Sequence, residues 1–292
     1  MSRWHKSGKA LLDEIAASRP GAGEAYVWFA GQHGFVIALG GLVFYIDVIL
    51  NDFCGPDGKS LRAYPPPFDP GERQRVDYVL CTHNHLDHLN LDTLLPLAEA
   101  NPQARFVVPA PLRRLLCDAG IARERTLAAR AGESIALAAG GAQAAELIPV
   151  PAVHSLRAGD EAEKDENGDY VCLGFALRGG GVSAYHSGDT WVAPPLLSAL
   201  KALGHVDIAM LPINGTDWER TAENCVGNMG PLDAAKLAKA ARFGLTIPAH
   251  YDLVAGNGEN PARFVEAMYA LCPEMRFHVC ALGERFVYRK SG

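Results

Sequence analysis

The sequence predicts an α/β fold in which short strands and helices build mixed sheets. Short runs of apolar, β-forming residues alternate with longer segments of helical periodicity. Glycine pairs separate some neighbouring strands, which indicates hairpins and therefore antiparallel pairs beside the parallel ones. Of the 292 residues, 49% are apolar, enough for a substantial core. Because no change in composition marks a linker, we predict one domain over residues 1–292, with residues 1–24 as an N-terminal helical extension.

The first half of the chain is predicted to contain five strands, two helices and a long loop. Gly40 and Gly41 separate the second and third strands, a sequence typical of a tight hairpin. Residues 51–72 are rich in proline and glycine, so we expect them to be irregular. The predicted strands are 25–30, 35–40, 42–48, 75–82 and 105–109, and the predicted helices are 91–100 and 111–120.

The second half continues the alternation without a sequence repeat. Residues 170–190 contain two apolar runs around three consecutive glycines, which predicts a second hairpin. Residues 157–170 are mostly acidic or polar and are expected to form an exposed insertion. The other predicted strands are 144–153, 205–213, 245–252, 276–280 and 284–288, and the predicted helices are 194–204, 231–244 and 261–271.

Charge and hydropathy argue against several classes of partner. The net charge is −6 and the basic residues are scattered, which is not typical of a nucleic-acid-binding surface. The sequence lacks an apolar run long enough for a membrane-spanning helix and the apolar core of a secretory signal. Its seven cysteines form no CxxC pair, as in reduced cytosolic proteins. We therefore expect a cytoplasmic protein with a small-molecule substrate, no nucleic-acid partner, no stable membrane insertion and, by default, a homo-oligomeric state.

The strongest chemical signal is the segment CTHNHLDHLN, residues 81–90, which follows an apolar run. In an extended chain, side chains two positions apart point to one side, so His83 and His85 can converge on one ion. Asp87 and His88 follow where the chain turns and can face a second ion. Imidazole and carboxylate groups are suitable ligands for zinc, manganese or iron. This density of ligand-type side chains predicts a metal site rather than a solvated histidine loop.

Three later residues are candidates for the remaining ligands. His154, Asp189 and His250 each follow a predicted strand. Each one alone is an ordinary loop residue, but α/β folds collect their active residues at the carboxyl ends of strands. Their order after the first motif has the composition of a dinuclear centre. Asp189 is the natural bridge, because a carboxylate can give one oxygen to each ion.

These segments together resemble the metallo-β-lactamase superfamily. The resemblance is carried by HNHLDH (83–88), His154, SGDT (187–190) and PAHY (248–251), and it spans about residues 25–288. It implies a four-layer αββα sandwich with two metal ions at one edge. It also implies that His83, His85 and His154 hold one ion, that Asp87, His88 and His250 hold the other, and that Asp189 bridges them.

Within the superfamily, the chain looks most like the L-ascorbate-6-phosphate lactonase-like branch. The stretches that carry this similarity are LVFYIDVILNDFCGPDGK, CTHNHLDHLN, AYHSGDT, HVDIAMLPING, MGPLDAAKLA and IPAHYD. The branch implies manganese or zinc and cleavage of a phosphorylated sugar lactone. If the substrate is phosphorylated, a basic residue from the long loops should face the site. Lys59, Arg62, Arg157 and Arg220 are the candidates.

A dinuclear centre implies hydrolysis, because bound metal ions lower the pKa of water. Asp87 then has a second role as acceptor of the proton from the attacking water. Asp47 is either a support for a ligand histidine or a strand-end cap. His33 lies in a turn and could line the pocket, and Asn214 could donate a hydrogen bond to the substrate, although both are also ordinary turn or loop residues.

The favoured function is a metal-dependent hydrolase that acts on a small lactone or ester. A phosphodiesterase of the same fold, of nucleotide or phospholipid type, is the alternative. An iron-dependent oxidoreductase is a further alternative, but the diiron flavoproteins of this fold carry Glu where this chain has His85. A binding module with a decayed site fits least, because every expected ligand is present.

Overall fold

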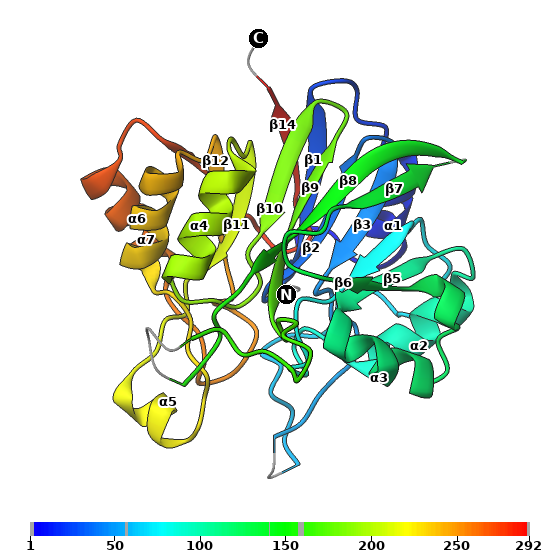
Figure 1. Ribbon diagram of the computed structural model, residues 1–292, viewed down its shortest axis with the longest axis horizontal. Helices are drawn as coiled ribbons and strands as arrows, with labels where there is room; N and C mark the ends of the chain where they lie inside the picture. Colours follow the sequence, from blue (N-terminus) through cyan, green and yellow to red (C-terminus); the bar gives the residue numbers. More distant parts are fainter. Residues whose placement is uncertain (1–2, 56–57, 140, 157–160, 291–292) are drawn as a thin grey trace.

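The computed structural model describes residues 3–55, 58–139, 141–156 and 161–290, which form two seven-stranded sheets flanked by helices. Figure 1 shows α4 (Pro194–Leu203), α6 (Pro231–Ala241) and α7 (Pro261–Leu271) at one side of the molecule. At the other side lie α2 (Leu91–Ala100) and α3 (Arg113–Asp118). The predicted α/β class and the arrangement of two mixed sheets between helices are therefore confirmed.

The first sheet has the order β14-β1-β2-β3-β4-β5-β6. The four strands from β14 to β3 pair antiparallel, whereas the pairs from β3 to β6 are parallel. Its strands are β1 (Glu24–Gly31), β2 (Gly34–Leu39), β3 (Leu42–Ile46), β4 (Tyr78–Leu80), β5 (Arg105–Pro109), β6 (Thr126–Ala129) and β14 (Arg285–Arg289).

The second sheet has the order β13-β12-β11-β10-β9-β8-β7 and the same mixed character. The strands from β7 to β10 pair antiparallel, and the pairs from β10 to β13 are parallel. Its strands are β7 (Ile135–Ala139), β8 (Ala142–Pro151), β9 (Leu173–Gly179), β10 (Val182–His186), β11 (Ile208–Pro212), β12 (Leu245–Ala249) and β13 (Arg276–Phe277).

Three apolar clusters hold the layers together. The cluster that draws on strands of both sheets includes Phe44 and Phe175. A second cluster packs α1 (Gly8–Ala17), α2 and α3 against the first sheet, and a third packs α4, α6 and α7 against the second. Burial of one large apolar side chain contributes roughly 1.5–3 kcal/mol. The N-terminal extension takes part through Leu11 and Ile15, while the single-domain organisation stays a prediction.

Both predicted hairpins form at glycine pairs. The β2–β3 turn contains Gly40 (φ 58°) and Gly41 (φ 84°), and the β9–β10 turn contains Gly180 (φ 58°) and Gly181 (φ 84°). A two-residue turn with positive φ at both positions matches the twist of the strands, and glycine adopts it without strain.

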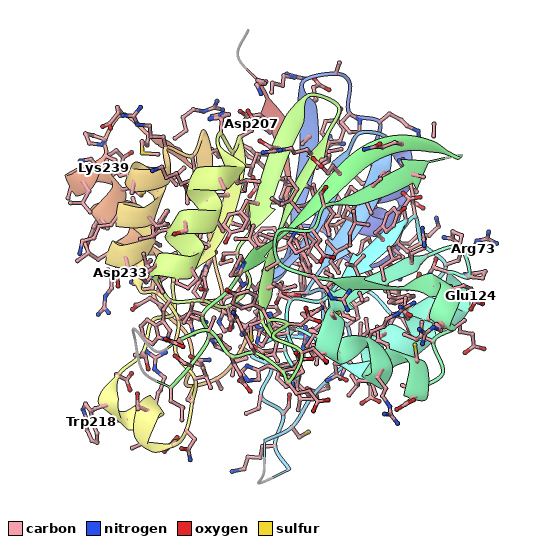
Figure 2. All side chains as sticks on the ribbon, in the orientation of Figure 1. Arg73, Glu124, Asp207, Trp218, Asp233 and Lys239 are labelled. Carbon is pink, nitrogen blue, oxygen red and sulfur yellow. The ribbon has the colours of Figure 1, made fainter. Side chains whose placement is uncertain are left out.

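Some elements differ from the sequence-based expectation. The sequence did not indicate β6 and β7, which read TLAA and IALAA. Alanine is a weak strand former, so pairing with β5 and β8 determines these strands. The short helix α5 (Trp218–Ala222) was also not predicted, and Figure 2 shows its Trp218 at the periphery of the molecule. Residues 157–160 of the predicted acidic insertion lie outside the described residues.

A membrane crossing would need a long apolar helix, and none of the helices in the described residues meets that requirement.

Candidate metal centre

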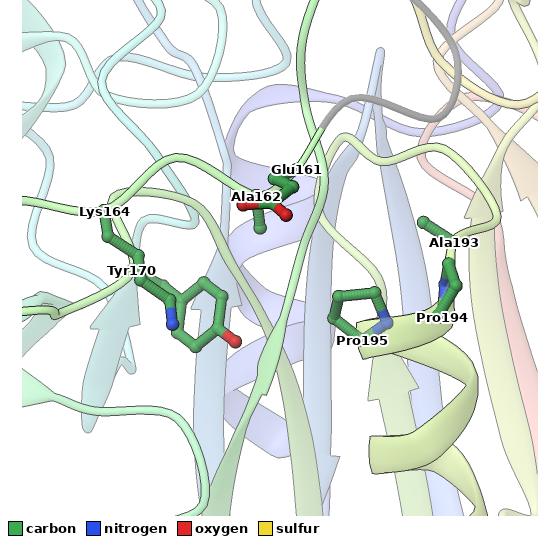
Figure 3. Close-up of a pocket in the computed structure, with 7 residues that line it drawn as sticks. All are labelled: Glu161, Ala162, Lys164, Tyr170, Ala193, Pro194 and Pro195. Atoms are coloured by element: carbon green, nitrogen blue, oxygen red, sulfur yellow. The ribbon is translucent and has the colours of Figure 1, made fainter.

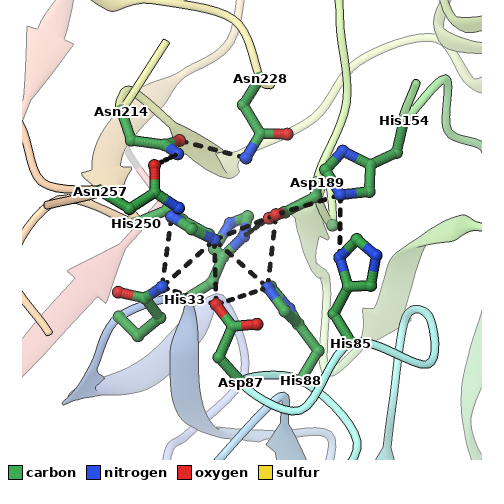
Figure 4. A network of polar contacts seen from close by, with 12 residues as sticks. His33, His85, Asp87, His88, His154, Asp189, Asn214, Asn228, His250 and Asn257 are labelled. Carbon is green, nitrogen blue, oxygen red and sulfur yellow. Dashed lines mark hydrogen bonds and ion pairs between the residues drawn. The ribbon is translucent and has the colours of Figure 1, made fainter. Parts of the chain in front are cut away.

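All seven residues that the sequence predicts as metal ligands meet at one edge of the two sheets. Figure 4 shows His85, Asp87, His88, His154, Asp189 and His250 with their side chains pointing toward one another. The loop after β4 supplies four of the seven, and the loops after β8, β10 and β12 supply one each. The predicted gathering at strand ends is therefore present. The role of each side chain as a ligand stays a proposal.

The loop after β4 is held by its own hydrogen bonds. The backbone N–H of Thr82 donates to Asp47 Oδ1 at 2.8 Å, which fixes the chain just before His83. The N–H groups of His88 and Leu89 donate to the carbonyl of His85 at 3.0 and 2.8 Å, so the motif turns at this point. Helix α2 begins directly afterwards with Asn90 as its N-cap.

The first group of ligand-type side chains consists of His83, His85 and His154. Their candidate ligand atoms lie within 4.8 Å of one another, and His85 Nδ1 is 3.1 Å from His154 Nε2. His154 Nδ1 donates to the carbonyl of Gly227 at 3.1 Å. In a neutral ring Nε2 then carries the lone pair that can bind an ion. Burial lowers the pKa of His83 and His85, and it lowers the pKa of His154 to about 4. Neutral imidazoles are the form that binds metal ions.

The second group consists of Asp87, His88 and His250. His88 Nε2 lies 3.5 Å from Asp87 Oδ2 and 3.3 Å from His250 Nε2. His250 Nε2 lies 3.4 Å from Asp87 Oδ2. Burial alone would raise the pKa of Asp87, but the charge of His88 outweighs it and holds that pKa well below its usual range. The carboxylate is therefore ionised near neutral pH.

Asp189 lies between the two groups. Its Oδ2 is 3.0 Å from His250 Nε2, 3.4 Å from His88 Nε2 and 3.7 Å from His154 Nε2. The same oxygen therefore faces both groups, whereas Oδ1 lies 3.2 Å from His33 Nδ1. This arrangement differs from the expectation that Asp189 gives one oxygen to each ion, because His33 occupies the other oxygen.

The residue before Asp189 explains how its loop reaches the centre. Gly188 has φ 60°, and a Cβ atom there would lie 2.8 Å from the carbonyl oxygen of Leu173 and 3.0 Å from Thr82 Cβ. Only glycine lets the loop after β10 approach the loop after β4 this closely. The small residues of the SGDT segment thus have the role that the sequence suggests.

Asp47 both caps the strand end and supports ligand histidines. Its Oδ2 lies 2.7 Å from His88 Nδ1 and accepts a hydrogen bond from Thr82 Oγ1 at 2.6 Å. Thr82 Oγ1 is in turn 3.0 Å from His83 Nδ1. These contacts engage Nδ1 of His83 and of His88, so that Nε2 of both rings is directed toward the centre. The two interpretations left open by the sequence therefore both apply.

His33 and Asn214, the two predicted substrate contacts, are both buried in the structure. His33 is fully buried, pairs with Asp189 and stacks on His186 at a ring-centroid distance of 4.0 Å. Asn214 is 1% exposed; its Nδ2 donates to Asn257 Oδ1 at 3.0 Å and its Oδ1 accepts from Asn228 at 3.1 Å. Figure 4 shows these three asparagines as a cluster near His250. In the structure both side chains are buried and support neighbouring polar groups, and their contact with the substrate stays a prediction.

Gln32, which was not predicted as a site residue, contacts the centre directly. Its Nε2 donates to Asp87 Oδ2 at 2.7 Å. The available signal was the segment GQHG at residues 31–34, a polar pair between two apolar strands. A polar pair in a turn is normally solvated, so the pattern alone did not point to the site.

The donors present fit metal ions. His83 Nε2 is buried and has no hydrogen-bond partner among the described residues, although it faces the other imidazoles. A buried nitrogen lone pair without a partner is unfavourable unless a cation or proton completes it. The set of imidazoles and carboxylates is typical of zinc, manganese or iron sites.

A separate cluster of ligand-type side chains lies away from the centre, between β13 and β14. The candidate ligand atoms of His278, Cys280 and Glu284 lie within 4.8 Å of one another. His278 Nε2 lies 2.8 Å from Glu284 Oε1, and the N–H of Ala281 donates to Glu284 Oε2 at 2.7 Å. These contacts close the turn, so we place no ion there.

A pocket of about 400 Å³ opens where the acidic insertion meets the start of α4. Figure 3 shows that none of its seven lining residues is a proposed metal ligand. Its cation, Lys164, lies 4.5 Å above the ring of Tyr170 and is engaged there. The lining of this pocket therefore contributes no proposed ligand to the centre.

The fold and the paired His/Asp groups define the chain as a metal-dependent hydrolase with the metallo-β-lactamase fold. Residues 47–251, most of the chain, match the family described as Beta-lactamase superfamily domain. The chain belongs to this family. The narrower L-ascorbate-6-phosphate lactonase-like branch stays a prediction, because this family model describes the superfamily and does not distinguish its branches.

Two curated relatives illustrate the range of the family. A UPF0173 metal-dependent hydrolase from Thermofilum pendens is 30% identical over 237 residues, which cover 77% of this chain and 87% of the relative. N-acyl-phosphatidylethanolamine-hydrolyzing phospholipase D 1 from Caenorhabditis elegans is 25% identical over 238 residues, which cover 77% of this chain and 63% of the relative.

Solved structures show the same fold at lower identity. The isothiocyanate hydrolase from Delia radicum gut bacteria has a TM-score of 0.67 at 17% identity and covers 91% of this chain and 100% of its own. Igni18, a metallo hydrolase from Ignicoccus hospitalis, has a TM-score of 0.66 at 19% identity and covers 92% of this chain and 100% of its own. These likenesses establish the fold.

Proposed function

We propose that the chain uses two divalent transition-metal ions, zinc or manganese, to hydrolyse a small lactone or ester. The position of Asp189 Oδ2 carries this proposal, because it lies within 3.7 Å of imidazoles from both groups. His83, His85 and His154 would hold one ion, Asp87, His88 and His250 the other, and Asp189 would contact both. When bound, such ions lower the pKa of water and polarise the scissile carbonyl.

Asp87 is the residue that we propose to accept the proton of the attacking water. Its side chain is 17% exposed, whereas that of Asp189 is 4% exposed. Of these two carboxylates, Asp87 is thus the one that solvent and substrate reach more easily. It is ionised near neutral pH, so its oxygens can accept a hydrogen bond from the water that it would deprotonate.

Exposed apolar side chains on the loops that carry the proposed ligands favour a substrate with an apolar substituent. Leu86, between His85 and Asp87, is 57% exposed. Leu156 and Val192 follow His154 and Asp189 closely in the sequence and are 39% and 36% exposed. Large apolar side chains exposed on the loops of a polar site are typical of contacts with apolar ligands.

The described arginines give less support to a phosphorylated substrate. Arg62 donates to the carbonyls of Ile49, Asn51 and Tyr64. Arg220 donates to Asp217 Oδ2 at 2.8 Å, and its Nη1 donates to the Asn257 side chain and the Asn214 carbonyl. Both guanidinium groups therefore support loops, while Arg157 lies outside the described residues. An ester or lactone with an apolar acyl group fits this environment better than a phosphorylated sugar lactone.

A phosphodiesterase is the second candidate, favoured by the Caenorhabditis elegans relative, whose name states hydrolysis of a phospholipid. The same exposed apolar side chains suit the acyl chains of such a substrate. The centre itself does not discriminate, because two metal ions can stabilise the attack on a phosphoryl or a carbonyl group. The cytoplasmic location and the homo-oligomeric state stay predictions.

Metal analysis and a substrate panel test this proposal. Elemental analysis of the purified, unchelated protein should find close to two transition-metal ions per chain and identify them. The protein should then hydrolyse acyl lactones and carboxylic esters faster than bis(p-nitrophenyl) phosphate and phospholipids. The reverse order would favour the phosphodiesterase, and folded protein without metal would contradict both.

A further inference from the structure

The turn between β1 and β2, residues 31–34, buries two polar side chains beneath the centre. Gln32 is 1% exposed and His33 is fully buried. Buried polar groups require hydrogen-bond partners to offset the loss of water. The partners of these two side chains are the two carboxylates of the centre, Asp87 and Asp189.

The backbone of Gln32 has a left-handed conformation that glutamine rarely adopts. Its φ is 56°, a value at which glycine is less strained. Its N–H donates to Asp252 Oδ1 at 2.9 Å, and its carbonyl accepts a hydrogen bond from the N–H of His250. Backbone contacts thus hold this position on both sides. Glycine at position 32 would preserve the path of the chain and remove only the side chain.

The side-chain amide of Gln32 acts on one group of the centre. Its Nε2 lies 2.7 Å from Asp87 Oδ2 and 3.3 Å from His250 Nε2. Its Oε1 is buried and has no hydrogen-bond partner within the described residues. The N–H contact with Asp87 is therefore the interaction that orients the amide.

The neighbouring His33 supports a different part of the centre. Its Nδ1 lies 3.2 Å from Asp189 Oδ1, and its carbonyl accepts a hydrogen bond from His186 Nε2 at 2.7 Å. Because Asp189 faces both groups, a change at His33 should affect both ions. A change at Gln32 should affect one.

We infer that Gln32 is a positioning residue for the group Asp87, His88 and His250. Its amide fixes Asp87 Oδ2 and so sets the affinity and geometry of the ion held there, without acting on His83, His85 and His154. The inference rests on the proposed function in so far as two ions bind. Loss of a hydrogen bond that supports a metal ligand weakens metal binding by about 10–100-fold.

Titration of metal-free protein with Co²⁺, followed by calorimetry and visible absorption, tests this role. The wild-type protein should show two binding events, and His250→Ala identifies the one that belongs to the second group. Gln32→Gly suits the backbone, and Gln32→Met keeps the length of the side chain without its N–H. Both should weaken the second-group event by about 10–100-fold, change its Co²⁺ spectrum and leave the other event unchanged.

A matched control is Arg242→Gly. Arg242 ends α6 with φ 54°, so this variant relieves the same backbone strain at an exposed position, and both binding events should stay as in the wild type. Equal weakening of both events by the Gln32 variants would overturn the inference, as would two unchanged events or an effect of Gln32→Gly without one of Gln32→Met. Wild-type protein that binds fewer than two ions would instead overturn the proposed function.

Discussion

The two sheets contribute to their shared edge in different ways. The first sheet supplies four proposed ligands on the single loop after β4, and also the residues that support this loop, Asp47 and Gln32. The second sheet supplies three proposed ligands from three separate strand ends. Two of these depend on the first sheet, because Asp189 pairs with His33 and the N–H of His250 donates to Gln32.

This difference shows how the centre is assembled. The first sheet builds a half-site that is largely positioned by its own hydrogen bonds, and the second sheet completes it with side chains held across the junction. Loss of a second-sheet ligand should therefore remove metal ions without unfolding the loop after β4. Loss of a supporting residue in the first sheet should weaken binding more gradually.

The largest effect is expected for Asp189→Ala. Asp189 Oδ2 lies within 3.7 Å of imidazoles from both groups, so its loss removes the contact that the two ions would share. We expect both ions to be lost or bound far more weakly and activity to fall by more than about 1,000-fold. Elemental analysis and initial rates measure the two effects.

Asp118→Ala is the control for this variant. Asp118 lies on α3, where its exposed side chain pairs with Arg114. This change should leave metal content and activity as in the wild type. If Asp189→Ala retained two tightly bound ions, Asp189 would not be the shared contact.

A smaller effect is expected when one group is disabled at a time. His154→Ala removes a proposed ligand of the first group, and His250→Ala removes one of the second. Each variant should retain about one ion per chain and lose activity by about 100-fold or more. Elemental analysis distinguishes this result from complete loss of metal, which would mean that the two groups do not bind independently.

The four proposed ligands on the loop after β4 could be predicted from the sequence, because they lie close together in it. Four ligand-type side chains within residues 83–88 form a local pattern, and strand ends then pointed to His154, Asp189 and His250. The helices at 91–100 and 261–271 match the structure because their apolar positions have helical periodicity. In the structure Asn90 and Asn260 cap the first turns of these helices.

The supporting contacts could not be predicted in this way. Gln32 and Asp87 are 55 positions apart, and His33 and Asp189 are 156 apart. Strand pairing within the first sheet brings Gln32 to Asp87, and the packing of the two sheets brings His33 to Asp189. Nothing in the local sequence reports either contact. The burial of His33 and Asn214, the two predicted substrate contacts, was not predicted either, since burial depends on the layers above them. Their contact with the substrate stays a prediction.

A moderate effect is expected for Asp47→Asn, which tests the support within the first sheet. The carboxylate lies 2.7 Å from His88 Nδ1 and accepts from Thr82 Oγ1, so it fixes the orientation of two proposed ligands. An amide can present N–H where His88 needs an acceptor. Metal affinity should therefore fall by about 10–100-fold with the protein still folded. Competition with a metal chelator measures the affinity, and an unchanged value would leave Asp47 with its strand-capping role alone.

The smallest effect concerns His186, which joins the sheets below the centre. It lies in β10, its Nε2 donates to the carbonyl of His33 at 2.7 Å, and its Nδ1 accepts from the N–H of Gly188 at 3.1 Å. A proton on Nδ1 would face this N–H group. The pKa of His186 is lowered to about 3, chiefly by burial and to a smaller extent by the neighbouring His33.

Acid should therefore destabilise the junction through His186. Because its pKa in the folded state is below the ordinary value of about 6.5, the unfolded chain binds a proton that the folded chain rejects. The contribution of His186 to stability is present above pH 6.5 and is lost as the pH falls toward about 3, at no more than about 1.4 kcal/mol per pH unit. In metal-free protein, urea unfolding between pH 6 and 4 should show a shallower loss of stability for His186→Gln than for the wild type. Equal slopes for His186→Gln and the wild type would show that the junction accepts the proton in the folded state.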